Sequence, residues 1–289
     1  LQGAYLMPPP PPLPDLILDP IVRLALTEDL GRAGDLTTDA TIAPGTQMRA
    51  EIRARKAGIL AGMDAAAYAL KLVDPAVELD VHINDGGKLA PGAAIAALSG
   101  PARSILTAER TMLNFLGRLS GIATLTGEFV EKVSGTDATI VCTRKTTPGH
   151  RAVEKRAVRC GGGTSHRYGL DDAILIKDNH IAACGSISEA LKRAHAYAGH
   201  LRMIEIEVDT LEQLEEALPH KPHAVLLDNM DTGTLKKAVA MIDGTCKAEA
   251  SGGVNLETVA GIAATGVDYI SVGALTHSAS NLDVGLDVA

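Results

Sequence analysis

Short apolar segments alternate regularly with amphipathic ones from about residue 120 onward, and this pattern constrains the fold more than any other feature of the sequence. Six segments are predicted strands: 138–143, 173–176, 203–208, 224–227, 247–250 and 269–272. Helical periodicity marks five others: 152–160, 187–197, 211–218, 235–242 and 256–264. Such alternation predicts a parallel sheet covered by helices and buried on both faces. An open doubly wound sheet and an α/β barrel both fit this pattern.

The polar residues that follow the strands favour the barrel. In an α/β barrel the C-terminal ends of all strands meet at one mouth, where the active site lies, whereas an open sheet gathers such residues at one crevice. Each predicted strand ends in chemically useful residues: Thr143-Arg144-Lys145, Lys177-Asp178, Glu207, Asp228, Ser251-Gly252-Gly253 and Gly273-Ala274. We therefore expect an α/β barrel whose mouth collects these groups.

The residues before the alternating region predict a smaller domain. Helical spacing at 17–30 and 106–119, with strand-like runs at 49–55 and 93–98, indicates an α+β domain over residues 16–118. Residues 1–15 contain five consecutive prolines and are expected to form a disordered leader. Whether the residues before Met7 are native is left open. The barrel domain is expected over 119–275, with 276–289 returning to the N-terminal domain.

Positive charge is concentrated in one part of an acidic chain. The 289 residues carry a formal charge of −8, yet the stretch from Thr143 to His180 has eight Lys or Arg against four acids, a local +4. Lys155, Arg156 and Arg159 are expected to form a solvated helix face. The cations flanked by apolar runs are expected to be partly buried and to need an anionic partner.

Composition excludes several other functions. Only 2% of residues are aromatic, which with the negative charge disfavours a nucleic-acid surface. The sequence has neither an apolar run of roughly 18 residues nor a secretory signal pattern, so we expect a cytoplasmic protein that does not span a membrane. Its four cysteines are widely spaced without a CxxC pair, which disfavours a metal cage or a disulfide framework.

Two groups of residues at the predicted mouth suit anions. The turns Ser251–Gly253 and Val272-Gly273 offer backbone N–H groups to a phosphate, and we expect a helix near Asn255 to add its dipole. Arg144 suits a carboxylate and Lys145 a phosphate. Further cations and one histidine join them: His166, Arg167 and Lys177.

A carboxylate pair, Glu207 and Asp228, also ends strands at the mouth. Such a pair can act as acid and base, hold a metal, or bind sugar hydroxyls, and the sequence leaves these alternatives open. Glu205 lies on the same strand face as Glu207, so one of the two is expected to serve structure only.

Motifs spread over nearly the whole chain after the proline leader resemble those of the quinolinate phosphoribosyltransferases (nicotinate-nucleotide pyrophosphorylases, carboxylating). In chain order they are Glu28-Asp29-Leu30-Gly31, Gly34-Asp35-Leu36-Thr37-Thr38, Leu106-Thr107-Ala108-Glu109-Arg110, Leu113-Asn114-Phe115, Thr143-Arg144-Lys145-Thr146-Thr147-Pro148-Gly149, Cys160-Gly161-Gly162-Gly163, His166-Arg167, Leu175-Ile176-Lys177-Asp178-Asn179-His180, Glu205-Ile206-Glu207-Val208, Leu227-Asp228-Asn229-Met230 and Glu249-Ala250-Ser251-Gly252-Gly253.

This resemblance implies a fold and a reaction. The fold is an N-terminal α/β sandwich domain followed by a seven-stranded α/β barrel, with the unassigned seventh strand expected near 158–163 or 121–126. The reaction joins quinolinate to 5-phosphoribosyl 1-diphosphate and yields nicotinate mononucleotide, pyrophosphate and carbon dioxide, a step of de novo NAD biosynthesis. Both substrates are polyanions, which accounts for the local positive charge.

The resemblance also implies roles for individual residues. The implied quinolinate site comprises Arg110, Thr143, Arg144, His166, Arg167 and Lys177. The implied phosphoribosyl diphosphate site comprises Lys145, Glu207, Asp228, Ser251, Gly252, Gly253, Val272 and Gly273, of which Lys145, Glu207 and Asp228 are the implied catalytic residues. Mg²⁺ is the implied cofactor, held mainly by substrate near Glu207 and Asp228, with ligands unknown. Arg110 would come from the partner subunit of a homodimer, or of a hexamer built from dimers.

Two alternatives remain at this stage. A phosphoribosyltransferase of the same fold could use another acceptor, such as nicotinate, or belong to the relatives associated with molybdate uptake. Four cations, Arg110, Arg144, Arg167 and Lys177, favour a dicarboxylate over a monocarboxylate. A non-catalytic anion-binding protein is disfavoured by Glu207 and Asp228, because binding anions alone does not require carboxylates beside them.

Overall fold

The computed structural model describes residues 10–288, which form two compact units. The N-terminal unit combines Leu1–Gly127, Thr146–Gly162 and Thr276–Ala289, and the barrel unit combines Glu128–Lys145 and Gly163–Leu275. Helix α4 (Ala102–Lys132) contributes residues to both units. Among the described residues, no helix has the length and apolar character needed to cross a membrane.

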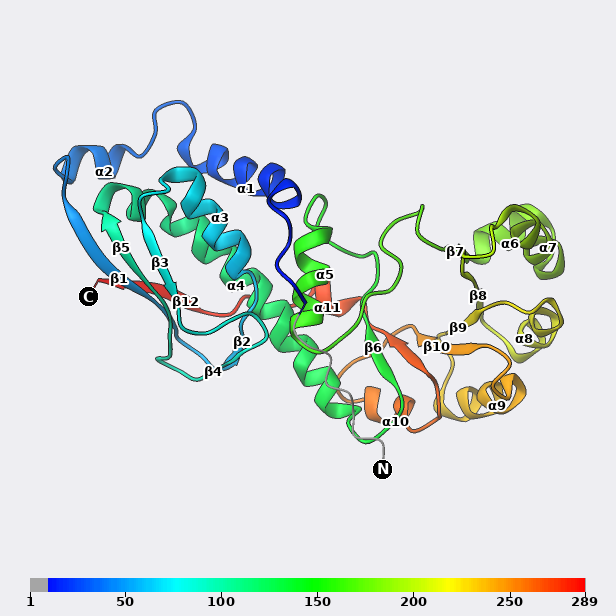
Figure 1. Cartoon of the computed structure of the whole chain (residues 1–289). Helices are drawn as coiled ribbons and strands as arrows, with labels where there is room; N and C mark the ends of the chain where they lie inside the picture. The colour runs from blue at the N-terminus through cyan, green and yellow to red at the C-terminus, as the bar shows by residue number, and fades with distance from the viewer. Residues whose placement is uncertain (1–9, 289) are drawn as a thin grey trace. The chain divides into compact units, whose positions relative to one another are not determined.

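An antiparallel sheet forms the centre of the N-terminal unit (Figure 1). Its strand order is β12 (Val284–Val288), β1 (Gln47–Ala54), β5 (Ala94–Pro101) and β3 (Glu78–Val81). Along β1, Ala50, Ile52 and Ala54 are buried while the residues between them are not, so alternate side chains fill the core. Two shorter strands, β2 (Gly58–Ile59) and β4 (Lys88–Leu89), pair separately.

Helices complete this unit. They are α1 (Asp15–Leu30), α2 (Leu36–Thr41), α3 (Met63–Val73), the first part of α4, and α5 (Arg151–Cys160). Helix α1 packs against α3. The predicted helices at 17–30 and 106–119 correspond to α1 and to part of α4, whereas α2 and α3 were not predicted. Strand β12, close to the C-terminus, pairs with β1 near the start of the chain.

The leader lies mostly outside the described residues. Of its described part, the carbonyl oxygens of Pro10 and Pro11 accept hydrogen bonds from the Arg156 guanidinium at 3.3 and 3.0 Å, and the backbone N–H of Leu13 donates to Asp64. Helix α1 begins directly afterwards, at Asp15.

Helix α5 corrects one expectation. Lys155 and Arg156 are 2% and 8% exposed instead of solvated, and only Arg159 of the three is exposed. Arg156 forms ion pairs with the buried carboxylates of Asp64 and Asp85. A guanidinium can be buried when carboxylates neutralise it and accept its hydrogen bonds. Periodicity within the helix could not reveal these partners, because both lie more than 70 residues away in sequence.

A second buried charge in α5 holds the turn that follows the Thr143-Arg144-Lys145 motif. The carboxylate of Glu154 is completely buried and accepts hydrogen bonds from the backbone N–H and the hydroxyl of Thr147 at 3.0 and 2.8 Å. Arg118 of α4 pairs with the same carboxylate at 3.0 Å. The turn at Thr147 is therefore fixed by side chains of its own unit.

The barrel unit contains a six-stranded parallel sheet, with α7, α8 and α9 along its outer side (Figure 1). In spatial order the strands are β6 (Thr139–Val141), β11 (Tyr269–Ser271), β10 (Lys247–Ser251), β9 (Ala224–Asp228), β8 (Ile204–Val208) and β7 (Ile174–Ile176). The helices are α6 (Asp178–Cys184), α7 (Ile187–Tyr197), α8 (Leu211–Ala217), α9 (Thr232–Ile242), α10 (Val259–Ala263) and α11 (Ala274–His277). All six predicted strands are present, and the α/β-barrel fold is confirmed.

Neither segment named for the seventh strand is itself a strand, but the residue that takes this place directly follows one of them. Residues 121–126 belong to α4, and 158–163 cover the end of α5 and the turn after it. Both segments are largely buried, as a barrel strand would be, although Arg159 and Gly162 are exposed. Instead, Thr164 forms a parallel bridge with Val141, donating to Ile140 O and accepting from Cys142 N. Thr164 thus takes the place beside β6.

Candidate active site

The parallel register places the predicted carboxylates and the glycine turn at one edge of the sheet. Ser251, the last residue of β10, pairs with Asp228, the last residue of β9, while Glu207 of β8 pairs with Leu226. Because side chains alternate along a strand, Glu207, Asp228 and Ser251 share a face with Glu205 and Glu249 two residues earlier. The acidic residues therefore form two levels: Glu207 and Asp228 at the strand ends, and Glu205 and Glu249 deeper.

The cations come from two segments of the barrel unit. Arg144 and Lys145 follow β6, where the Thr143 hydroxyl accepts the backbone N–H of Lys145 at 3.0 Å. Arg144 is half-buried and Lys145 is exposed. Arg167 lies on the segment between Thr164 and β7, is half-buried, and donates from its Nη1 to Ala173 O at 3.2 Å.

Electrostatics link these segments. Burial lowers the pKa of the Arg167 guanidinium, and the nearby positive charge of Arg144 lowers it further, while Glu205 and Asp172 act in the opposite direction. The Nε of Arg167 is buried without a hydrogen-bond partner in the described part of the chain. Two arginines close together and partly removed from water create a strong demand for an anion.

Lys177 and Glu207 form an ion pair from the ends of neighbouring strands, with the glutamate side chain 12% exposed and the lysine side chain 43% exposed. A pair of opposite charges at the mouth can be reorganised by a charged substrate. Arg167 and His180 also line a cavity of about 510 Å³ at β7, together with Leu175 and Cys184.

The glycine turn after β10 is built around Asn229. Its backbone has a φ of 53°, its Nδ2 donates to Asp228 Oδ2 at 2.5 Å, and its N–H donates to Ser251 O at 2.9 Å. Gly252 has a φ of +91°, and a Cβ there would lie 2.1 Å from Asn229 Oδ1. Only glycine fits this position. The turn and Asp228 are thus held together by one asparagine.

The expected helix after this turn begins later than predicted. Helix α10 starts at Val259 instead of near Asn255, because Asn255 accepts from the backbone N–H groups of Glu257 and Thr258 and stabilises a turn there. The predicted start of this helix is therefore wrong, while the contribution of its dipole to phosphate binding stays a prediction. Val272, which is buried, and Gly273 follow β11 directly.

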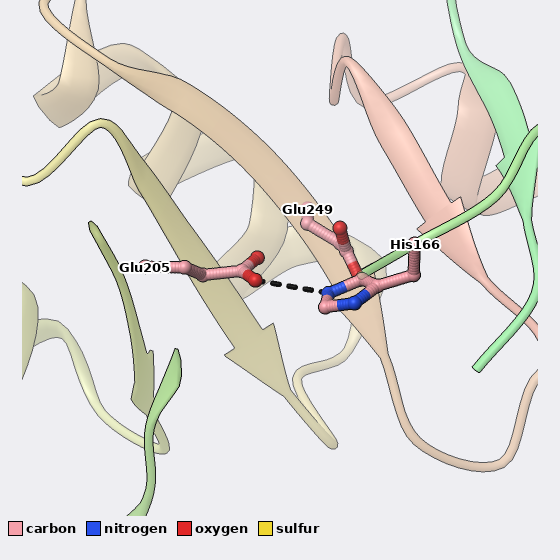
Figure 2. Close-up of side chains that lie close together, drawn as sticks. All are labelled: His166, Glu205 and Glu249. Atoms are coloured by element: carbon pink, nitrogen blue, oxygen red, sulfur yellow. Dashed lines mark hydrogen bonds and ion pairs between the residues drawn. The ribbon is translucent and has the colours of Figure 1, made fainter. Parts of the chain in front are cut away.

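Deeper on the same face, three side chains point toward one another (Figure 2). His166 Nε2 lies 2.9 Å from Glu205 Oε2 and 3.6 Å from Glu249 Oε1. All three side chains are at least 88% buried. Burial raises the pKa of Glu249 to about 7 and the charge of Glu205 adds to this rise, whereas a positive charge on His166 would act in the opposite direction.

Sequence reasoning missed Glu249 and Asn229 as site residues. Glu249 alternates with Ser251, and this spacing could have placed it inside the barrel. Nothing local indicates the αL conformation of Asn229 except the asparagine itself, a residue that tolerates it.

Arg110 lies on an exposed face of α4 in the N-terminal unit. Its helix is tied to the chain's first motifs, since Thr107 donates to Asp35 Oδ2 at 3.1 Å and Thr111 to Asp29 Oδ2 at 3.2 Å. Asp35 also caps α2 by accepting the N–H of Thr38. These motif residues therefore anchor the helix, and the membership of Arg110 in the quinolinate site stays a prediction.

Comparisons with known proteins cover almost the entire chain. Residues 35–120 match the quinolinate phosphoribosyl transferase N-terminal domain, and residues 122–287 match the C-terminal domain of the same enzymes. A probable nicotinate-nucleotide pyrophosphorylase (carboxylating) of Bacillus subtilis is 47% identical over 90% of this chain and 90% of its own. The Mycobacterium leprae nicotinate-nucleotide pyrophosphorylase (carboxylating) is 46% identical over 92% and 95%.

A solved structure is also similar. The nicotinate-nucleotide pyrophosphorylase of Francisella tularensis superposes with a TM-score of 0.92 at 39% identity, over 96% of this chain and 98% of its own. The order of motifs, the two-unit architecture and these matches agree with one another. This chain belongs to the quinolinate phosphoribosyltransferase family.

Proposed function

We propose that this enzyme transfers the 5-phosphoribosyl group of phosphoribosyl diphosphate to the ring nitrogen of quinolinate, with decarboxylation, through the residues at the mouth of its barrel. The products are nicotinate mononucleotide, pyrophosphate and carbon dioxide. The observation that carries the residue assignment is the electrostatic proximity of half-buried Arg144 and Arg167, from segments 23 residues apart in sequence.

The quinolinate side of the site uses this cation pair. Arg144 and Arg167 would each clamp a ring carboxylate, because a guanidinium matches a carboxylate with two parallel hydrogen bonds. Lys177 would add a third cation once it exchanges its ion pair with Glu207 for one with the substrate. His166 and Thr143 lie next to the two arginines, His166 beside Arg167 and Thr143 beside Arg144. A dicarboxylate would satisfy the unmet Nε of Arg167 and relieve the repulsion between the arginines.

The phosphoribosyl diphosphate side uses the carboxylates and the glycine turn. Glu207 and Asp228 would accept hydrogen bonds from the ribose hydroxyls and offset positive charge that develops at C1′ as pyrophosphate leaves. Lys145, which is exposed, would stabilise the departing diphosphate. Backbone N–H groups would bind phosphate oxygens in two turns, one formed by Ser251, Gly252 and Gly253 and the other by Val272 and Gly273.

Chemistry then depends on orientation more than on proton transfer. Attack of the ring nitrogen on C1′ forms an N–C bond as the C1′–O bond to pyrophosphate breaks, and leaves a cationic pyridinium. When the C2–carboxylate bond breaks and carbon dioxide leaves, the electron pair stays on C2, where the adjacent cationic nitrogen stabilises it. The C2 carbon then takes a proton. Clamping both carboxylates out of the solvent supplies the required orientation.

Mg²⁺ fits this site as an ion carried by the substrate. The mouth offers carboxylate oxygens, which hard cations prefer, but Glu207 already accepts from Lys177 and Asp228 from Asn229. Phosphate oxygens would therefore be its main ligands. The ion would neutralise the charge of the leaving diphosphate.

We also propose a cytoplasmic homodimer, or a hexamer built from dimers, in which Arg110 enters the quinolinate site of the partner. The exposure of Arg110 on a well-anchored helix is compatible with this role. Arg110→Ala and Lys145→Ala should each abolish turnover, and mixing the two inactive proteins should restore some activity through hybrid dimers. Absence of recovery, with subunit exchange verified by mass spectrometry, would contradict a shared site.

One assay tests the proposed function. Purified protein with Mg²⁺ and phosphoribosyl diphosphate should convert quinolinate, and not nicotinate, to nicotinate mononucleotide, with product identified by chromatography. Product from nicotinate alone would support the alternative phosphoribosyltransferase. Binding of phosphoribosyl diphosphate without product from either acceptor would support the non-catalytic alternative.

A further inference from the structure

His166 is held at both ring nitrogens by the protein itself. Its Nε2 lies 2.9 Å from Glu205 Oε2, and its Nδ1 accepts the backbone N–H of Arg167 at 2.7 Å. The side chain is only 12% exposed. Figure 2 shows the ring next to both Glu205 and Glu249, which extend from β8 and β10. Two hydrogen bonds in different directions leave the imidazole plane little freedom.

The direction of one of these bonds determines where the imidazole proton lies. A backbone N–H can only donate, so the Nδ1 facing Arg167 must accept and cannot carry a proton. The proton of the neutral ring therefore sits on Nε2 and is donated to Glu205. Adding a second proton to form imidazolium would break the bond to Arg167.

The same hydrogen bond favours a proton over a metal ion at this cluster. One nitrogen of His166 and one oxygen each from Glu205 and Glu249 lie within 4.8 Å of one another, close enough for a cation. A histidine that binds a metal through one nitrogen normally donates the N–H of the other. Here the other nitrogen accepts, so a metal on Nε2 would leave the ring with no proton at all. The geometry favours a proton.

The two carboxyls also need a proton between them. Glu205 and Glu249 are 11% and 6% exposed, and each has a buried Oε1 without a hydrogen-bond partner in the described residues. The groups that face Glu249 are Glu205, His166 and the Ser271 hydroxyl, and its raised pKa of about 7 follows from burial and the Glu205 charge. Protonation of Glu249 removes the charge repulsion between the two carboxyls.

We propose that Glu205 is a positioning residue for quinolinate: it fixes His166 as a neutral, Nε2-protonated imidazole, whose Nδ1 in turn fixes the backbone of Arg167 so that the Arg167 guanidinium can bind a ring carboxylate. Glu249, when protonated, contributes by removing the charge repulsion at Glu205. His166 then acts through Arg167 instead of binding substrate through a ring nitrogen. This inference rests on the proposed role of Arg167 in quinolinate binding.

Steady-state kinetics of the full-length protein test the proposal through a matched pair of variants. Glu205→Leu removes the acceptor for the Nε2 proton and should raise the KM for quinolinate by about tenfold, the value of one buried hydrogen bond, with the KM for phosphoribosyl diphosphate unchanged. Glu205→Gln keeps an amide oxygen as acceptor and should stay within about threefold of the wild type. Glu215→Leu, at an exposed position of α8, is the control.

Two kinetic results would overturn the proposal. If Glu205→Gln loses as much as Glu205→Leu, the site requires a full negative charge, as an imidazolium or a metal would. If Glu205→Leu changes both KM values equally, its effect is not specific to quinolinate. A wild-type protein that is inactive with quinolinate would instead refute the proposed function itself.

A measurement on the wild-type protein covers the case in which Glu205→Leu does not fold. Nitrogen-15 NMR of histidine-labelled protein without substrate, with His166 assigned by comparison with His166→Gln, should show the neutral Nε2-protonated form from pH 5.5 to 8. An imidazolium or an Nδ1-protonated ring would overturn the proposal. So would one equivalent of tightly bound metal, measured by elemental analysis, that is absent from His166→Gln.

Discussion

Glu249→Gln should remove a pH dependence of stability that the wild-type protein owes to one buried carboxyl. In the folded chain burial, aided by the charge of Glu205, raises the pKa of Glu249 to about 7 from an ordinary value of 4.5. Between these two pH values the unfolded chain has released a proton that the folded chain still holds. The contribution of Glu249 to the free energy of unfolding is therefore greatest at low pH and falls as the pH rises from 4.5 to about 7.

The size of this effect follows from the pKa difference. A rise of about 2.5 pH units corresponds to about 3 kcal/mol of unfolding free energy, at 1.36 kcal/mol per unit. Glutamine resembles the protonated carboxyl in shape and cannot ionise. The difference in unfolding free energy between Glu249→Gln and the wild type should therefore shift in favour of the variant by up to about 3 kcal/mol from pH 4.5 to pH 8.

Urea unfolding followed by circular dichroism at several pH values measures this difference. Glu215→Gln, at an exposed position, is the matched control and should follow the wild-type curve at every pH. Parallel curves for the wild type and Glu249→Gln would refute the reasoning, because they would mean that Glu249 ionises in the folded chain as it does in water.

Three further substitutions test other parts of the structure. Arg156→Met leaves two buried carboxylates without their cation and should destabilise the N-terminal unit by about 3–5 kcal/mol, measured by urea unfolding; a loss below 1 kcal/mol would contradict the buried ion pairs. Gly252→Ala, strained by a positive φ and a steric overlap, should raise the KM for phosphoribosyl diphosphate at least tenfold, whereas Gly199→Ala, which has open space, should have no effect. Lys177→Met should raise the KM for quinolinate about 10- to 100-fold, the value of a charge-assisted hydrogen bond, and an unchanged KM would exclude Lys177 from the site.

Strands and helices of the barrel unit were predictable because each carries its own periodic signal. Helix α7 was predicted with the observed ends, Ile187 and Tyr197, and every barrel strand was found. The seventh position was missed because Thr164 contributes a single bridged residue, too short for any periodicity. Helix α6 was missed for a related reason, since its seven residues include no buried side chain.

Residues of the site were predictable only where the pattern of a single chain segment indicated them. The strand-end residues Glu207, Asp228 and Ser251 follow from strand periodicity and lie at one edge of the sheet. Arg156 is buried because it pairs with Asp64 and Asp85, which are distant in sequence. Likewise, His166 contacts Glu205, which lies 39 residues further along the chain. Such pairings arise from tertiary packing, which local composition does not encode.

Release of carbon dioxide from quinolinate labelled with carbon-14 in its C2 carboxylate tests the central claim most directly. With Mg²⁺ and phosphoribosyl diphosphate, purified protein should release labelled carbon dioxide, pyrophosphate and nicotinate mononucleotide in equal amounts. A nucleotide that retains the label, or formation of nicotinate mononucleotide only when nicotinate is supplied, would contradict the account.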